Sequence, residues 1–293
     1  MREIEASRVE CVWPVKAELG ESPLWSPAEN ALYFLDIEAP AIHRLAASGE
    51  RSTWRMPKKV AALALRENGG FIAAFSDGVF ALDLDSGRRC LLAEPEPDRP
   101  NNRLNDGRCD AAGRFWVGSM DEDEERSTGA LYRLDTDHSL QKVDDGYIVA
   151  NGPAFSPDGR ILYESDTFQS VIYAFDVDDG GNVANRRVFA RFETGDGRPD
   201  GLTVDSEGGV WAAVSGGWSM TRFTPDGRRD AVVRLPASQV TASSFGGAKL
   251  DQLYITTARS DLSADEIASQ PLAGSLFAVD VGFRGLAPHA YAG

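Results

Sequence analysis

Apolar and polar positions along the chain follow a pattern that recurs six times. Each copy has one short apolar run, a polar stretch and a second apolar run. The first runs lie at 32–35, 71–74, 115–118, 162–163, 210–213 and 253–256, and the second runs lie at 42–45, 79–82, 131–134, 172–175, 220–223 and 276–279. A repeat of about 40 to 50 residues is the period of a four-stranded propeller blade. The pattern therefore predicts an all-β fold, a six-bladed β-propeller with four-stranded antiparallel blades around a central channel.

Another strand is expected before each first run, because turn residues separate the two, as in 110–113 and 156–159. One position recurs four residues before the last apolar residue of that strand. Blade by blade it is occupied by Glu21, Ala61, Asn105, Asn151, Asp200 and Thr241. Equivalent positions at the start of the innermost strands of a propeller form a ring around one mouth of the channel. Because four of the six are carboxylates or carboxamides, we expect an oxygen-rich ring at that mouth.

Such a ring predicts a bound cation. Carboxylates gathered at a partly enclosed mouth repel one another and lose hydration, which is costly unless a positive charge neutralises them. We therefore expect one divalent metal ion. Ca²⁺ suits these ligands best, and Zn²⁺, Mn²⁺ and Fe²⁺ stay open. Each of the segments 105–107, 151–152 and 200–201 has, by itself, the sequence of an ordinary turn. Four residues with side-chain oxygens at the same position of an otherwise apolar repeat nevertheless favour a metal site.

The net charge, the lengths of the apolar runs and the continuity of the repeat limit the classes of function and the number of domains. The net charge of −15 argues against nucleic-acid binding, which needs a basic surface. No apolar run reaches transmembrane length and the N-terminus lacks a signal-peptide pattern, so we expect a cytoplasmic protein without a membrane partner. The repeat runs through the chain without a linker, which predicts a single domain over 1–293. No obligate protein partner is indicated.

The sequence offers little support for catalysis by a nucleophilic serine or by paired cysteines. The chain has no G-x-S-x-G motif, and His43, His138 and His289 fall in a strand, a turn and the tail, so serine hydrolase chemistry is not supported. The three cysteines have no CxxC spacing and read as free thiols, with Cys109 packed on an inner strand. Residues 9–13 alternate as a strand expected to join the last blade. Residues 261–267 predict a short helix capped by Ser263.

Several segments resemble the gluconolactonase family that includes senescence marker protein (regucalcin) and luciferin-regenerating enzyme. They lie at 19–25, 102–107, 113–120, 151–153 and 199–201, in the order and spacing of the family. The resemblance runs nearly end to end and implies a six-bladed propeller that hydrolyses sugar lactones with one divalent metal ion. It also implies roles for single residues: Glu21, Asn151 and Asp200 as metal ligands, Asp200 also as general base, and Arg103 with Asn105 as substrate-binding residues.

Two positions follow the family less cleanly. The acidic residue expected to contact substrate falls in the run 121–125, where counting from Asn105 indicates Asp123 and a slip of one residue indicates Glu122. Such runs are usually solvated loops. Glu164 stands where the family usually has a less charged residue, and we expect it either to face outward or to perturb packing.

Three functions are weighed. The first is metal-dependent hydrolysis of a small-molecule sugar lactone, such as glucono-, xylono- or arabinonolactone, to the aldonic acid. The second is a non-catalytic calcium-binding or regulatory propeller, which gains nothing from a cation such as Arg103 beside its ligands. The third is an interaction scaffold, which has no need of polar oxygens converging in the channel mouth. The residues favour the lactonase, and leave the sugar, the lactone ring size and the oligomeric state open.

Overall fold

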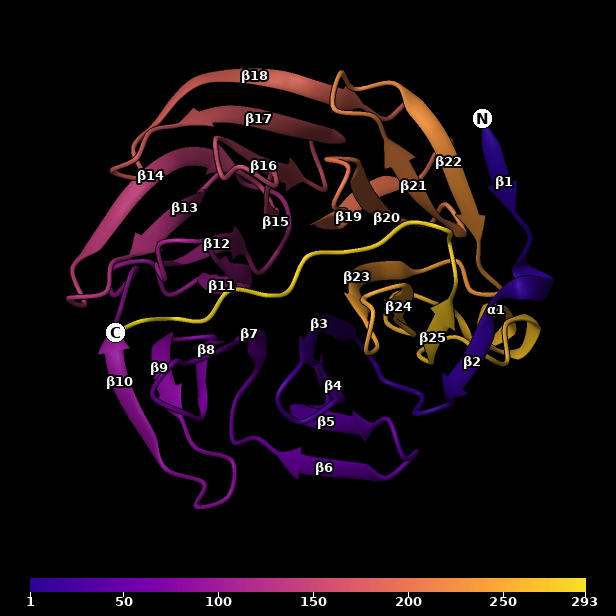
Figure 1. Ribbon diagram of the computed structural model, residues 1–293, viewed down its shortest axis with the longest axis horizontal. Coiled ribbons are helices and arrows are strands. Elements are labelled where there is room, and N and C mark those ends of the chain that lie inside the picture. Colours follow the sequence, from indigo (N-terminus) through magenta and orange to yellow (C-terminus); the bar gives the residue numbers. More distant parts are fainter.

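Six sheets surround a central channel in the computed structural model, which describes residues 1–293 (Figure 1). In five of the blades the chain runs from the innermost to the outermost strand. Blade A contains β3 (Gly20–Ser26), β4 (Ala31–Asp36), β5 (Ala41–Ala46) and β6 (Arg51–Arg55), and blade B contains β7 (Val60–Leu65), β8 (Phe71–Phe75), β9 (Gly78–Leu82) and β10 (Arg89–Ala93). Blade C contains β11 (Asn102–Cys109), β12 (Phe115–Asp121), β13 (Gly129–Leu134) and β14 (Leu140–Tyr147), and blade D contains β15 (Ala150–Phe155), β16 (Ile161–Asp166), β17 (Val171–Val177) and β18 (Val183–Arg191). Blade E contains β19 (Arg198–Val204), β20 (Val210–Ser215), β21 (Ser219–Phe223) and β22 (Arg229–Arg234). All pairings within these blades are antiparallel between chain neighbours, so the predicted fold is confirmed.

Blade F is built from both parts of the chain. It contains β23 (Val240–Gly246), β24 (Gln252–Thr257) and β25 (Leu276–Val279), and β2 (Glu10–Trp13) supplies its outermost strand by pairing antiparallel with β25. The expectation that 9–13 completes the last blade is thus confirmed. A shorter strand, β1 (Arg2–Ile4), pairs parallel with β22 as a fifth strand of blade E, which the alternation of the sequence did not indicate.

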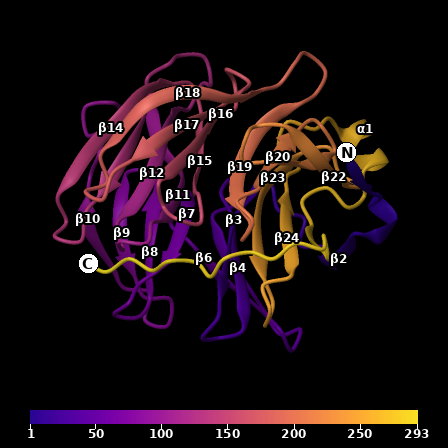
Figure 2. The ribbon, with the colours of Figure 1, turned by 45° about the horizontal axis from the view of Figure 1, so that its top comes forward.

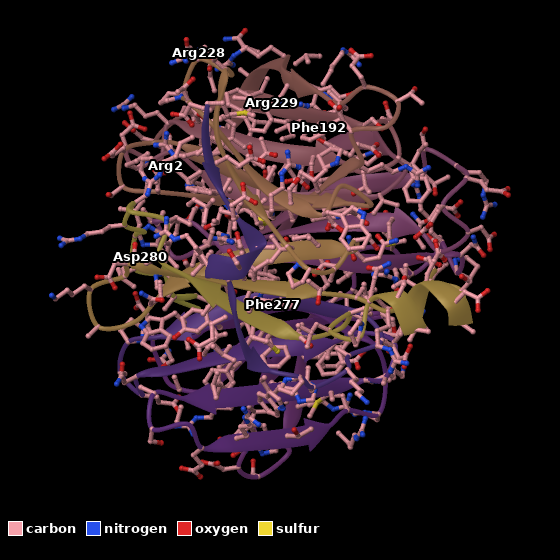
Figure 3. All side chains as sticks on the ribbon, turned by 90° about the vertical axis from the view of Figure 1, so that its right-hand side faces the viewer. Arg2, Phe192, Arg228, Arg229, Phe277 and Asp280 are labelled. Atoms are coloured by element: carbon pink, nitrogen blue, oxygen red, sulfur yellow. The ribbon has the colours of Figure 1, made fainter.

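Packing occurs between the blades, and this explains why apolar residues recur with the blade period. The buried apolar side chains form six clusters, and each cluster joins two neighbouring blades. Phe277 of β25, for example, packs between blades E and F (Figure 3). Because each sheet is covered on both faces, strands such as β4 and β8 are buried along their whole length instead of on alternate residues.

One helix decorates blade F. The helix α1 (Ala264–Ser269) begins after Ser263, whose hydroxyl oxygen accepts a hydrogen bond from the Glu266 amide, while the Ser263 amide donates to the Glu266 carboxylate. This capping box confirms the predicted cap, although the helix starts and ends slightly later than expected. The only other helical segment is a 3₁₀ turn at Ala6–Arg8.

The last residues form a strap, 282–293, across the mouth where the innermost strands end. Figures 1 and 2 show it crossing from blade F to blades B and C. The Gly285 amide donates to the Leu250 carbonyl, and the Tyr291 amide donates to the Leu65 carbonyl. Tyr291 is fully buried and its hydroxyl donates to the Asp135 carbonyl at 2.8 Å. The strap therefore closes one mouth, and the opposite mouth stays accessible.

No helix of the structure has both the length and the apolar character needed to cross a membrane. Of the cysteines, Cys109 is buried on the inner strand β11, as expected.

Candidate functional site

The ring positions point into the channel because every innermost strand is irregular at the same place. In all six blades the pairing between the innermost strand and its neighbour shifts register at or directly after the ring position. Such bulges bend a strand and re-aim side chains. The repeat therefore encodes a turned side chain in each blade, which the sequence pattern located without revealing the bulge.

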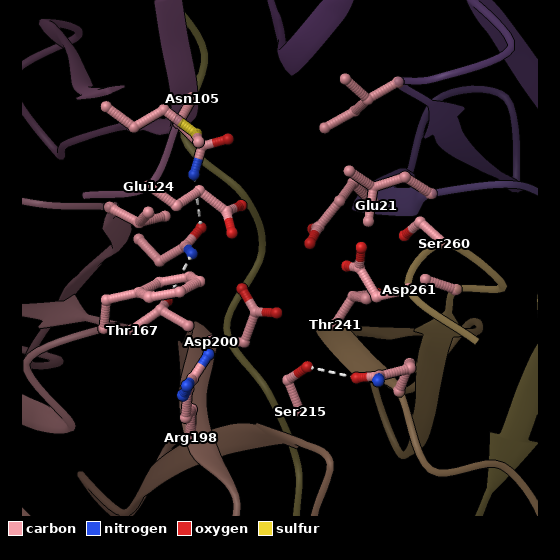
Figure 4. Close-up of a pocket in the computed structure, with 18 of the residues that line it drawn as sticks. Glu21, Asn105, Glu124, Thr167, Arg198, Asp200, Ser215, Thr241, Ser260 and Asp261 are labelled. Atoms are coloured by element: carbon pink, nitrogen blue, oxygen red, sulfur yellow. Dashed lines mark hydrogen bonds between the residues drawn. The ribbon is translucent and has the colours of Figure 1, made fainter. Parts of the chain in front are cut away.

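A cavity of about 320 Å³ occupies this mouth. It is lined by Glu21, Arg103, Asn105, Asn151, Asp200 and Thr241, with Glu124, Thr167, Phe168, Arg198, Ser215, Gln239, Ser260, Asp261 and several apolar residues. Thus five of the six ring positions line it, and Ala61 does not. The carboxylates of Glu21, Glu124, Asp200 and Asp261 point toward its middle (Figure 4). The volume suits a ligand the size of a sugar lactone.

Four side chains on one wall form a directed chain of hydrogen bonds. Arg103 Nη1 donates to Asn105 Oδ1 at 2.7 Å, and Asn105 Nδ2 donates to Asn151 Oδ1 at 2.9 Å. Asn151 Nδ2 then donates to Thr167 Oγ1 at 2.8 Å. Arginine can only donate, so Asn105 must turn its oxygen toward Arg103 and its amide nitrogen toward Asn151. The same logic fixes Asn151, whose oxygen has a second lone pair left for a ligand.

Glu21 of blade A and Asp200 of blade E line the same cavity and repel each other. Both are buried, at 6% and 8% exposure. Burial, followed by the charge of Asp200, raises the pKa of Glu21 well above its ordinary value. Burial, followed by the charge of Asp106, raises the pKa of Asp200 in the same way. Two buried carboxyls with raised pKa values are ionised together only when a cation compensates them.

Asp106 lies deeper in the channel. Its Oδ1 accepts a hydrogen bond from the Gly107 amide, and burial raises its pKa to about 7 despite the opposing charge of Arg108. It follows Asn105 directly, within the bulge of β11. Asp106 therefore adds negative potential beneath the ring, which the sequence offered only as a turn residue.

The donor set fits a hard divalent cation. Glu21, Asn151 and Asp200 offer two carboxylates and one amide oxygen around one cavity, which are oxygen ligands of the kind that Ca²⁺ takes. No group of three or more His, Cys, Asp and Glu side chains is arranged to hold a metal ion in this structure. Any ion here would accordingly depend on the Asn151 amide and on non-protein ligands to complete its coordination.

The acidic run 121–125 is not arranged as the sequence indicated. Asp123 is exposed, accepts a hydrogen bond from Asn101 Nδ2 at 3.0 Å, and does not line the cavity. Glu122 Oε2 lies 3.3 Å from Arg103 Nε, at ion-pair distance but without hydrogen-bond geometry. Glu124 alone reaches the cavity wall, on a backbone with φ of 58°. The structure therefore brings Arg103, Asn105, Glu21, Asn151 and Asp200 together and leaves Asp123 apart.

Glu164 does not face outward, so of the two alternatives only a perturbation of the packing is left. It is completely buried in β16, and neither carboxyl oxygen has a hydrogen-bond partner. Burial, followed by the charge of Asp106, raises its pKa well above the ordinary value. Burial thus favours the neutral form of this residue, which lies among packed side chains outside the cavity.

Among the cavity residues that the sequence pattern did not single out are Glu124, Thr167, Arg198 and Asp261. None occupies the ring position of a blade, and Glu124 and Asp261 sit in loops at positive φ. A pattern with the blade period carries no signal for them. None of the three histidines lines the cavity.

Comparisons with known proteins identify the family. A family model described as "SMP-30/Gluconolactonase/LRE-like region" matches residues 19–259. The chain is 39% identical over 287 residues to a 6-deoxy-6-sulfogluconolactonase of Pseudomonas putida, covering 97% of this chain and 99% of that protein. It is 36% identical to human regucalcin, with 98% and 99% of the two chains covered. The crystal structure of regucalcin from Agrobacterium tumefaciens, described as a calcium-binding protein, superimposes with a TM-score of 0.95 at 29% identity, covering 99% of both chains. This chain therefore belongs to the SMP-30/gluconolactonase/LRE-like family, as its motifs indicated.

Proposed function

We propose that this protein hydrolyses a sugar lactone to the aldonic acid with one divalent metal ion bound in the cavity. The observation that carries the proposal is the convergence of two buried, mutually repelling carboxylates with the directed Arg103–Asn105–Asn151 chain in one accessible cavity. Family membership and a relative that is named as a sulfogluconolactonase support the same reaction class.

Glu21, Asn151 and Asp200 would hold the metal ion. Their oxygens suit Ca²⁺ first, in keeping with the relative described as calcium-binding, while Zn²⁺, Mn²⁺ and Fe²⁺ stay open. A bound divalent ion supplies Lewis-acid chemistry, which polarises a carbonyl and stabilises developing negative charge. It also lowers the pKa of the neighbouring carboxyls, since it favours their charged forms.

The remaining chemistry falls to the side chains. Asp200, once ionised, accepts the proton of the attacking water as a general base. Arg103 has Nε free of any hydrogen-bond partner and is buried at 6% exposure, so its donors can hold substrate oxygens and the carboxylate that forms. Asn105 orients Arg103 and is the neutral member of the same wall. Among the acidic run, Glu124 replaces Asp123 as the proposed contact to substrate hydroxyls, because it reaches the cavity.

A second function, calcium binding without turnover, is favoured by the description of the Agrobacterium relative. Arg103 argues against it here. A cation beside the ligands lowers the affinity of an ion site by charge repulsion, whereas it contributes directly to holding a polyhydroxylated substrate with a developing carboxylate.

The test is acid release from a panel of aldonolactones at near-neutral pH, corrected for spontaneous opening. The panel holds glucono-, xylono-, arabinono- and 6-deoxy-6-sulfogluconolactone, each assayed with chelator and with single divalent metals restored. We expect chelator-sensitive turnover that Asp200→Asn lowers by about 10²- to 10⁴-fold, the usual effect of removing a general base. Asp179→Asn, at a side chain that is 98% exposed, is the matched control. Metal binding with no turnover on any lactone would favour the calcium-binding function, and turnover indifferent to chelator would exclude the metal.

A further inference from the structure

Arg198 is the one cavity arginine whose guanidinium is not engaged by the rest of the protein. It is the first residue of β19, two positions before Asp200, and it lines the cavity. Arg103, by contrast, donates to Asn105 and lies beside Glu122. Arg198 forms no side-chain hydrogen bond or ion pair, and its guanidinium carbon lies 4.3 Å from the ring centroid of Phe168. Its donors are therefore available to a ligand.

Stacking makes this free cation more than a solvated surface charge. A guanidinium over an aromatic face is attracted by the ring and held in place there, so less freedom is lost when a ligand binds. Phe168 is half-buried and lines the same cavity, which holds the stack against the wall. In Figure 4 the Arg198 side chain points toward the cavity from the side of Asp200.

The charge of Arg198 also acts inside the cavity. The pKa of Glu124 is raised, first by burial and then by the charge of Asp261, and both Arg103 and Arg198 oppose that rise. Arg198 thus contributes positive potential without forming an ion pair with Glu124. An arginine that faces a cavity with free, pre-oriented donors is suited to bidentate binding of an oxyanion.

The depth of the residues assigns the position of that oxyanion. Glu21 and Asp200 line the cavity as buried side chains, whereas Arg198 lines it as a solvent-exposed one and so lies on the side of the cavity nearer the solvent. A lactone carbonyl held near Asp200 leaves the far end of the sugar directed toward the mouth.

We propose that Arg198, stacked on Phe168, binds an anionic substituent on the end of the lactone substrate remote from the carbonyl, and so selects sulfonated, phosphorylated or carboxylated sugar lactones over neutral ones. This rests on the proposed lactonase function. The shared chemistry is a terminal oxyanion group. Arg198 is a specificity-determining residue in this assignment, because it contacts the substituent and not the reacting atoms.

The experiment measures kcat and KM of the full chain, supplied with divalent metal, on four glucono-lactones that differ at carbon 6: unsubstituted, sulfonate, phosphate and carboxylate. Variants are Arg198→Gln, which removes the charge, and Arg198→Lys, which keeps the charge but loses the two-pronged geometry. The matched control is Arg228→Gln. Arg228 is exposed in the turn between β21 and β22 (Figure 3). The antiparallel pairing of β19 to β22 puts this turn at the other end of the blade from Arg198.

We expect wild type to prefer one of the anionic lactones, and the preferred one identifies the substituent. Arg198→Gln should lower the ratio of kcat/KM for that lactone to kcat/KM for the unsubstituted lactone by about 10-fold or more, mainly through KM, as for loss of a charge-assisted hydrogen bond. Arg198→Lys should lower the ratio less, and Arg228→Gln should leave it unchanged.

Three results overturn the inference. Turnover of neutral lactone with no preference for any anionic one, or an Arg198→Gln variant whose ratio equals that of wild type, refutes the role of Arg198 while leaving the lactonase function standing. No turnover of any of the four lactones, neutral or charged, refutes both.

Discussion

Replacing Thr167 by valine tests whether the hydrogen-bond chain positions Asn151. Thr167 is 7% exposed, and its hydroxyl accepts from Asn151 Nδ2 at 2.8 Å. Valine has the same shape without the acceptor, so the Asn151 amide group loses this partner in a buried place. A buried polar group that loses its partner costs about 1–3 kcal/mol, so we expect Thr167→Val to lower the free energy of unfolding by that amount.

Rotation of the Asn151 amide cannot relieve the loss. A flip would turn its nitrogen toward Asn105 Nδ2, which already donates at 2.9 Å to the oxygen now there. Two donors would then face each other. Asn105 cannot flip in turn, because its oxygen accepts from Arg103, and arginine has no acceptor to offer. The whole chain is therefore pinned at the Arg103 end, and the cost falls on Asn151.

The assay is urea unfolding at neutral pH without metal, with Ca²⁺ titration by calorimetry as a second readout. Positioning of metal ligands by neighbouring groups commonly contributes 10- to 100-fold in affinity, so Thr167→Val should weaken Ca²⁺ binding by about that factor. Thr167→Ser keeps the hydroxyl and should restore both quantities. Thr194→Val, in an exposed loop, is the matched control. If Thr167→Val unfolds and binds Ca²⁺ as wild type does, the reasoning about a pinned amide is refuted.

Three further predictions concern charges in the blades. Asp205→Asn should cost about 3 kcal/mol in urea unfolding, because fully buried Asp205 pairs with buried Arg222. Asp230→Asn should cost under about 1 kcal/mol, because the Asp230 side chain, which pairs with the same arginine, is 25% exposed; equal losses would contradict this. Burial lowers the pKa of His43 from 6.5 to about 4, so as the pH falls the unfolded chain binds a proton at this residue before the folded chain does. The free energy of unfolding should therefore decrease by up to about 3 kcal/mol as the pH falls from 6.5 to 4. When wild type and His43→Leu are unfolded in urea across this pH range, the variant should lack that part of the decrease. The pKa of Glu164 is raised in the fold, so above pH 4.5 the folded protein retains a proton there that the unfolded chain releases. The free energy of unfolding of Glu164→Gln should therefore increase relative to that of wild type as the pH rises from 4.5 to 8. If the difference in the free energy of unfolding between the two proteins is the same at every pH, a protonated Glu164 is excluded.

The blade period explains what the sequence could predict. Glu21, Asn151 and Asp200 stand in one phase of an apolar repeat, and because each blade bulges in that phase, their convergence on one cavity followed from counting alone. Glu124 and Asp261 have no such phase. They reach the cavity from loops whose positive φ values depend on local geometry rather than on periodicity.

Other features depend on contacts between distant segments. The orientation of the Asn151 amide follows from Arg103 on β11 and from Thr167 in the turn after β16, which share no sequence motif with it. Asp205 begins a turn in which the Gly208 amide donates to its carbonyl, yet its carboxylate also accepts from Trp211 Nε1 at 2.9 Å and from Arg222. Tyr291 lies in a stretch of small residues without alternation, and only the fold shows it buried between blades. Such partners are set by the packing of blades, which a single-strand pattern does not encode.

The pairing of β2 with β25 has a consequence for how the chain folds during synthesis. Residues 10–13 emerge from the ribosome early, but their partner at 276–279 emerges almost last. Until then blade F lacks its outer strand, and the edge of β2 is free to pair wrongly with other chains. A contact between such distant segments is slow to form because a long loop must close first. We expect ring closure to be the late, rate-limiting step, and nascent chains halted before residue 276 to aggregate instead of waiting folded.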